Sequence, residues 1–152
     1  MSILFIIISL RCSKKSKIPS QYEKDNTNFK KSIILLNEAR DLSNPPESQR
    51  QPSFTLPKDI EAKIILKTEK GIKLGKEIND AYLDFLHPEL KIMFKHMLLK
   101  GTDFYYDGLK DNNSGKTAVD LKKQIQGNEL VIEWIRWWDK NGKSIADKVY
   151  GD

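Results

Sequence analysis

Apolar residues return every three or four positions along most of the chain after residue 57, and no stretch alternates as a β-strand would. This helical spacing holds over residues 58–86, 88–109 and 119–138. The pattern predicts an all-α fold, a small helical bundle of three to five helices after a flexible tether. A domain of this size with many large apolar side chains can build a core without disulfides.

The dipeptide His87-Pro88 marks a clear helix boundary. The residue before a proline avoids the α region, and proline suits the first position of the next helix. The helix that follows has two apolar sides, with Phe94 on one and Leu99 and Tyr106 on the other. A helix that is apolar on two sides usually packs between neighbours.

Glycines interrupt the helical pattern at three places. Gly71 and Gly75 stand one turn apart, and they either allow another helix to approach closely or mark a break. Gly127-Asn128 is expected to divide the 119–138 segment into two helices. Asn141-Gly142 is expected to stop it and to leave a short closing helix over residues 145–150.

Composition separates a tether from a folded domain. Residues 13–54 form the tether, which is basic and contains a short amphipathic helix over Phe29–Leu42 and then a Pro/Ser-rich linker. Residues 55–152 form the helical domain. The tether lies in the first 54 residues, which hold nine basic and five acidic side chains and so carry most of the net charge of +5.

This charge distribution bears on the partners. A nucleic-acid-binding domain would carry its basic excess as a patch on the folded part, so we expect no nucleic-acid partner. A basic tether instead suits an anionic membrane surface.

Few side chains offer catalytic chemistry, since the chain has one cysteine and two histidines. Residues 114–117 end like a phosphate-binding loop, but Lys110 stands where the first glycine is required. Asp111–Gly115 begins like a calcium loop but lacks the later ligands. We therefore expect a non-enzymatic protein with no catalytic residues and no metal or other cofactor.

One polar line on the 88–109 helix supports an alternative, a small hydrolase or metal-dependent enzyme. It consists of Glu89, His96, Asp103 and Asp107. His96 and Asp103 are separated by about 10 Å along a helix, so they can share a site only with help from a second helix. A solvated acidic face is the simpler interpretation.

Three tryptophans within five residues give the strongest interaction signal. Trp134, Trp137 and Trp138, with Arg136 on the opposite side of the same turn, are predicted to bind a partner because tryptophan and arginine dominate binding hot spots. The other interpretation is core packing, since the tryptophans share a helix face with Leu130.

The first twelve residues carry the most specific motif. An apolar run of signal-peptide length, Ile3–Leu10, is followed by Arg11 and the single cysteine, Cys12. This segment resembles the signal of bacterial lipoproteins, although Arg11 stands where that family has a small residue. The resemblance implies lipidation at Cys12 and, because Ser13 follows, anchoring at the outer membrane on its periplasmic side.

These features favour a membrane-anchored lipoprotein of the bacterial cell envelope. Its helical domain would bind an unknown protein partner as an accessory, immunity or exclusion factor. The alternative is a soluble cytoplasmic helical regulator, with nucleic acid as a conceivable ligand. Cys12 would then be an ordinary free thiol.

Overall fold

The computed structural model describes residues 18–43, 57–110 and 118–151, and within these ranges it contains helices and no β-strand. The prediction of a small all-α bundle is confirmed. In chain order the elements are the 3-10 helix η1 (Ser20–Tyr22), α1 (Glu23–Ser43), α2 (Lys58–Lys76), α3 (Asp80–Leu86), α4 (Leu90–Ile92), the π-helical segment η3 (Met93–Leu99), α5 (Lys100–Lys110) and α6 (Ala118–Tyr150).

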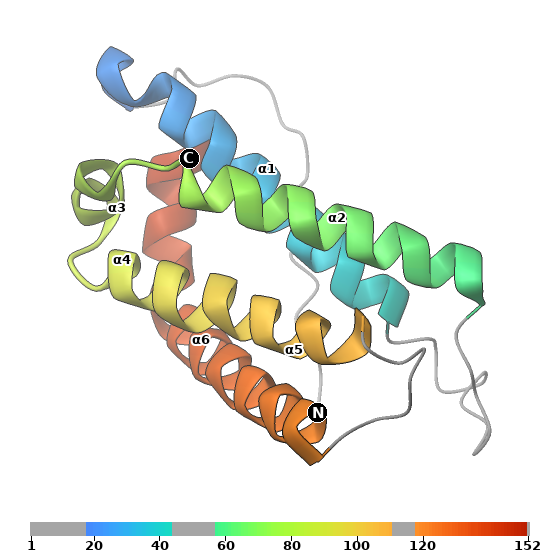
Figure 1. Cartoon of the computed structure of the whole chain (residues 1–152). Coiled ribbons are helices and arrows are strands. Elements are labelled where there is room, and N and C mark those ends of the chain that lie inside the picture. Colours follow the sequence, from blue (N-terminus) through green and yellow to red (C-terminus); the bar gives the residue numbers. More distant parts are fainter. Residues whose placement is uncertain (1–17, 44–56, 111–117, 152) are drawn as a thin grey trace.

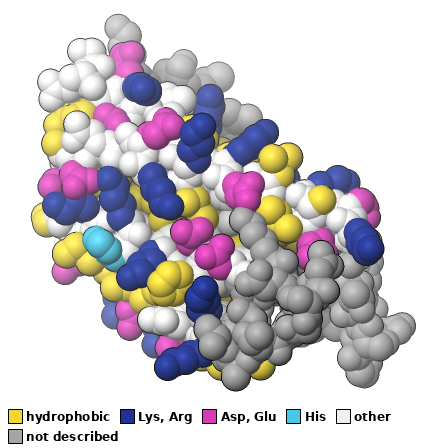
Figure 2. All heavy atoms as spheres, viewed as in Figure 1, with side chains coloured by type: hydrophobic (Ala, Val, Ile, Leu, Met, Phe, Trp, Pro, Cys, Tyr) yellow, Lys and Arg dark blue, Asp and Glu magenta, His cyan; other side chains and the backbone are white. Residues whose placement is uncertain are grey.

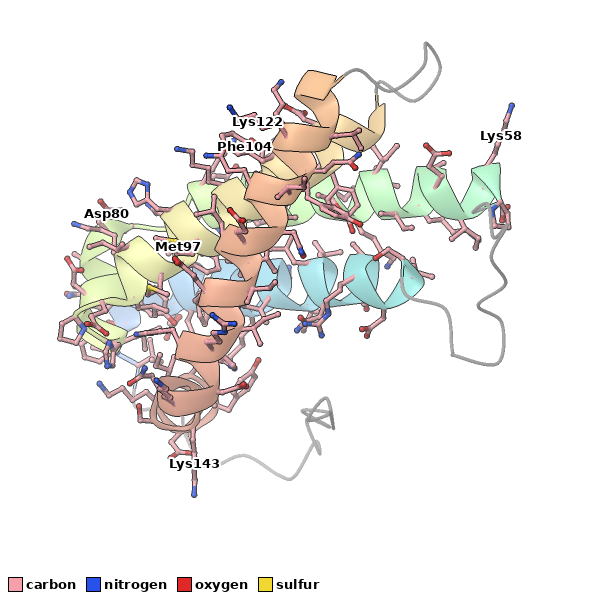
Figure 3. All side chains as sticks on the ribbon, turned by 90° about the horizontal axis from the view of Figure 1, so that it is seen from below. Lys58, Asp80, Met97, Phe104, Lys122 and Lys143 are labelled. Atoms are coloured by element: carbon pink, nitrogen blue, oxygen red, sulfur yellow. The ribbon has the colours of Figure 1, made fainter. Side chains whose placement is uncertain are left out.

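Two antiparallel pairs of long helices make up the described bundle (Figure 1). α1 packs along α2, and the continuous helix formed by α4, η3 and α5 packs against α6. Seen from below, α6 crosses over α1 and α2 at a steep angle (Figure 3). The short helix α3 closes one end of the bundle.

The core lies where these two pairs meet. Its fully buried members come from α3, α4, η3 and the last turns of α6, and they include Tyr82, Leu83, Leu90, Phe94, Ile145 and Val149. Each large apolar side chain removed from water contributes about 1.5–3 kcal/mol relative to its exposed state. Packing between the pairs therefore holds the bundle together.

The predicted boundary at His87-Pro88 is confirmed, since α3 ends at Leu86. Pro88 is not the first residue of the next helix, however, because α4 begins at Leu90. The 58–86 segment is not one helix, however. α2 ends at Lys76, and Asn79 caps a new helix by accepting a hydrogen bond from the Ala81 amide at 2.9 Å.

α1 is longer than predicted and belongs to the core, whereas the sequence placed a short helix within the tether. Phe29 of α1 is buried and its ring centre lies 5.1 Å from that of Phe94. The sequence pattern was weakened by buried polar residues such as Asn26 and Ser32. These are satisfied inside the bundle, because the Tyr82 hydroxyl donates to Asn26 Oδ1 at 2.8 Å and Ser32 Oγ donates to the Gly71 carbonyl at 2.8 Å.

The two breaks expected in the last helix were wrong, because α6 runs unbroken from residue 118 to 150. Gly127 lies at the crossing of α6 with α5, where a Cβ atom would come within 2.5 Å of the Gly101 carbonyl oxygen. Gly142 lies under the Trp138 indole, 2.6 Å from where its Cβ would stand. The helix ends instead at Gly151, whose φ of 79° is the left-handed conformation typical of a helix terminus.

Gly71 and Gly75 allow neighbouring helices to approach α2 closely and do not break it. Their absent Cβ atoms leave room for Leu36 of α1 and for Leu99 of η3, respectively. Leu99 thus faces α2, while Gly101 faces α6. The helix with two apolar sides lies between two neighbours, as expected.

Candidate functional site

Trp134 is a core residue and cannot form a binding surface. Its side chain is 6% exposed, and its ring lies 6.1 Å from Phe94. Trp138 stacks on it at 5.0 Å with an interplanar angle of 30° and covers Gly142. These contacts favour the core-packing interpretation for both indoles, although Trp138 is only partly buried.

Trp137 joins α6 to the start of α4. Its indole Nε1 donates a hydrogen bond to Glu89 Oε2 at 2.8 Å, and its ring meets His87 edge-on at 5.1 Å. The polar group of this side chain is therefore already used within the bundle. Arg136 differs from the tryptophans, because it is exposed on the outward face of α6.

The outward face of α6 carries a stripe of large aliphatic side chains that we call the α6 stripe. It consists of Leu121, Ile125 and Ile132, which are 45%, 62% and 37% exposed. At about 100° per residue, these three and Arg136 fall within about 60° of one another around the helix axis. Scattered exposed aliphatic residues are ordinary on protein surfaces, but these three lie on one side of a single helix, with the exposed residues Asn128 and Glu129 in the turn between Ile125 and Ile132.

Sequence reasoning counted Leu121 as one of the helical apolar positions but did not separate it from the core face. The sequence did contain a signal for this second face, because the α6 stripe lies about half a turn around the helix from the line of Trp134 and Ile145. Exposed polar residues flank the stripe with mixed charge, including Lys122 and Glu129. Figure 2 likewise shows basic and acidic side chains intermixed over the face drawn, without a patch of one sign.

A groove of about 420 Å³ lies between α2 and α5. Its floor is buried and contains Thr68 and Tyr106, and its rim is charged, with Lys76 Nζ 3.6 Å from Asp103 Oδ2. Burial raises the pKa of the Tyr106 hydroxyl, against the lowering effect of the Ser43 and Thr68 hydroxyls beside it. Thr68 Oγ1 meets no partner in full hydrogen-bond geometry, so this contact with Tyr106 is a loose one.

The groove does not bring together the four residues on which the enzyme alternative depends. Asp103 and Asp107 line it, but His96 does not, and Glu89 is held by Trp137. Among the residues that the structure describes, no group of three or more His, Cys, Asp and Glu side chains could hold a metal ion.

Several predicted features lie outside the described residues. They are the signal-like segment with Cys12, the Pro/Ser-rich linker after α1 apart from Ser43, and the loop of residues 111–117. In the described part of the chain, none of the helices has the length and apolar character needed to cross a membrane.

No protein-family model, curated protein sequence or solved structure matches this chain. Function has to be inferred from the residues and contacts described above.

Proposed function

We propose that the chain is a lipid-anchored protein of the bacterial envelope whose helical bundle binds a protein partner and catalyses no reaction. The α6 stripe carries the binding part of this proposal. Its members are held outward by a helix whose opposite face is locked into the core through Trp134 and Ile145. The anchoring part is supported by the sequence around Cys12.

The spacing of the α6 stripe indicates the kind of partner. Leu121 and Ile125 are four residues apart, and Ile125 and Ile132 are seven apart, as in one seam of a coiled coil. From residue 121 to 132 the stripe extends about 16 Å along the helix axis. A partner that lays an amphipathic helix along this strip would cover all three side chains.

Photo-crosslinking in the cell tests the binding surface. A photoreactive residue at position 125 of the full-length chain is expected to give a discrete adduct with one protein. The same residue at position 66 is the matched control, because Leu66 is an exposed aliphatic residue on α2 with 52% of its surface accessible. The substitution Ile132→Glu should abolish the adduct at 125 and leave the fold intact.

Absence of an adduct at 125, or equal adducts at 125 and 66, would contradict the proposed surface. An adduct with a second copy of the chain would show that the α6 stripe mediates self-association and does not bind a different protein.

Anchoring is tested by intact mass and membrane fractionation of the full-length chain beside Cys12→Ala. A chain that starts at Cys12, carries a lipid-sized mass gain and loses it in the variant supports the anchor. An unmodified chain in the soluble fraction refutes it and leaves the cytoplasmic alternative.

A further inference from the structure

The groove between α2 and α5 is elongated along the helices. Its α2 side runs from Ile65 to the C-cap residue Glu77, about 18 Å along the helix axis. Its volume of about 420 Å³ lies within the range of small-molecule sites. The described residues of its lining include no member of the α6 stripe, so the groove is separate from the proposed partner surface.

The described rim of the groove is acidic on balance. Lys76 pairs with Asp103 at 3.6 Å, whereas Glu77 and Asp107 form no ion pair with any described residue. In all, four carboxylates and two lysines line the groove, which gives a net charge of −2; they are Glu69, Glu77, Asp103, Asp107, Lys73 and Lys76. A cleft lined by an excess of one sign of charge concentrates ligands of the opposite sign.

The two carboxylates without an ion pair are spaced along the groove. α2 and α5 run antiparallel (Figure 1), and Asp103 is paired with Lys76, the residue before Glu77. Asp107 lies one turn beyond Asp103 on α5, in the direction away from Glu77. The carboxylates of Glu77 and Asp107 are therefore separated by about 7.5 Å along the helix axes.

Below this rim, the groove offers apolar surface and one hydrogen-bonding group. Ile65, Ile72 and the Tyr106 ring supply apolar contact for a flexible chain, and an aromatic ring is also a favourable neighbour for a cation. Thr68 is 2% exposed, and its Oγ1 has no partner in full hydrogen-bond geometry among the described residues. Because buried hydroxyls are nearly always paired in native proteins, this oxygen in the lining points to a donor that a ligand supplies.

We propose that the groove binds a linear aliphatic diamine. Its two ammonium groups would lie at Glu77 and Asp107, and its methylene chain would lie against Ile72. An ammonium group has three donors and no acceptor, so the one at Asp107 can also donate to Thr68 Oγ1. This site depends neither on an anchor at Cys12 nor on the α6 stripe, and its test leaves the proposed function unaffected.

The test is an NMR titration of the isotope-labelled full-length chain with the five-carbon diamine cadaverine. Amide shifts in α2 and α5 should saturate. Pentylamine has the same chain but only one ammonium group, and it should bind about tenfold more weakly because one charge-assisted contact is lost. Glutarate, a five-carbon dicarboxylate, should give no saturation.

Two pairs of substitutions locate the site. Asp103→Asn together with Asp107→Asn should weaken cadaverine binding by about tenfold or more. Glu129→Gln together with Glu133→Gln is the matched control, because these exposed carboxylates are likewise one turn apart but lie on α6. This control pair should leave the affinity unchanged.

Thr68→Val tests the floor, since it keeps the side-chain shape and removes the hydroxyl. It should weaken cadaverine binding, and circular dichroism should show an unchanged fold. Unchanged affinity in Thr68→Val would overturn the role of the floor. The diamine site is overturned if cadaverine does not saturate, if pentylamine or glutarate binds as well, or if both acidic pairs lose equal affinity.

Discussion

The close crossing of α5 and α6 predicts that Gly127→Ala destabilises the fold. The added methyl group would lie 2.5 Å from the Gly101 carbonyl oxygen and 2.6 Å from the Tyr105 amide nitrogen. Both of these atoms belong to the backbone of α5, so no side chain can rotate to relieve the clash. The two helices have to separate.

The magnitude follows from two opposing effects. Forcing extra volume into a packed interface costs about 3 kcal/mol. Replacing a glycine inside a helix by alanine gains about 1 kcal/mol. We expect a net loss of about 2 kcal/mol in the free energy of unfolding, which lowers the Tm by roughly 4–8 °C in a chain of this length.

Urea denaturation followed by circular dichroism measures this loss. Gly142→Ala is the matched control, because the three atoms nearest to its methyl group all belong to the ring of Trp138, a partly buried side chain that can move. It should be less destabilising than Gly127→Ala. If Gly127→Ala is as stable as the wild type, the helices do not cross at this distance and the assignment of Gly127 to a close crossing is wrong.

Two further predictions concern the core, and a third concerns the surface ion pair between Asp80 and Lys95. Tyr82→Phe removes the donor to buried Asn26 and should cost about 1–2 kcal/mol in urea denaturation; an unchanged midpoint would show that water replaces the donor. Trp134→Ala should cost about 3–5 kcal/mol, because it empties a buried indole site; a loss below that of Tyr82→Phe would contradict its place in the core. The hydrogen bond from Lys95 holds the pKa of Asp80 below its ordinary value, so its stabilising effect is present above about pH 4 and lost as the pH falls through the folded-state pKa. Asp80→Asn should therefore reduce the loss of stability on acidification, and an identical pH profile would refute the contribution of this pair.

The sequence by itself determined the helical character of the chain. The 3.6-residue period is a local property, and so is the boundary at His87-Pro88, where proline chemistry excludes a continuous helix. The shared face of Trp134 and Leu130 was visible for the same reason. Which side chains line up on a helix follows from spacing alone.

The part played by α1 could not be predicted locally. Asn26 and Ser32 look like surface residues in the sequence, and only partners from α3 and α2 make their burial favourable. A polar side chain that is satisfied by a distant element weakens the amphipathic pattern of its own helix. The sequence therefore assigned this helix to a tether.

The role of Gly127 and the exposure of the α6 stripe depend on the tertiary structure for a related reason. Gly127 has the same local preference whether a helix breaks there or another backbone crosses over it. Leu121 and Trp134 are both apolar positions of one helix, and periodicity does not say which face a neighbour covers. α5 covers α6 at Gly127, and Phe94 of η3 covers it at Trp134, whereas Leu121 is left in solvent. The candidate binding surface therefore exists only because of how the helices pack.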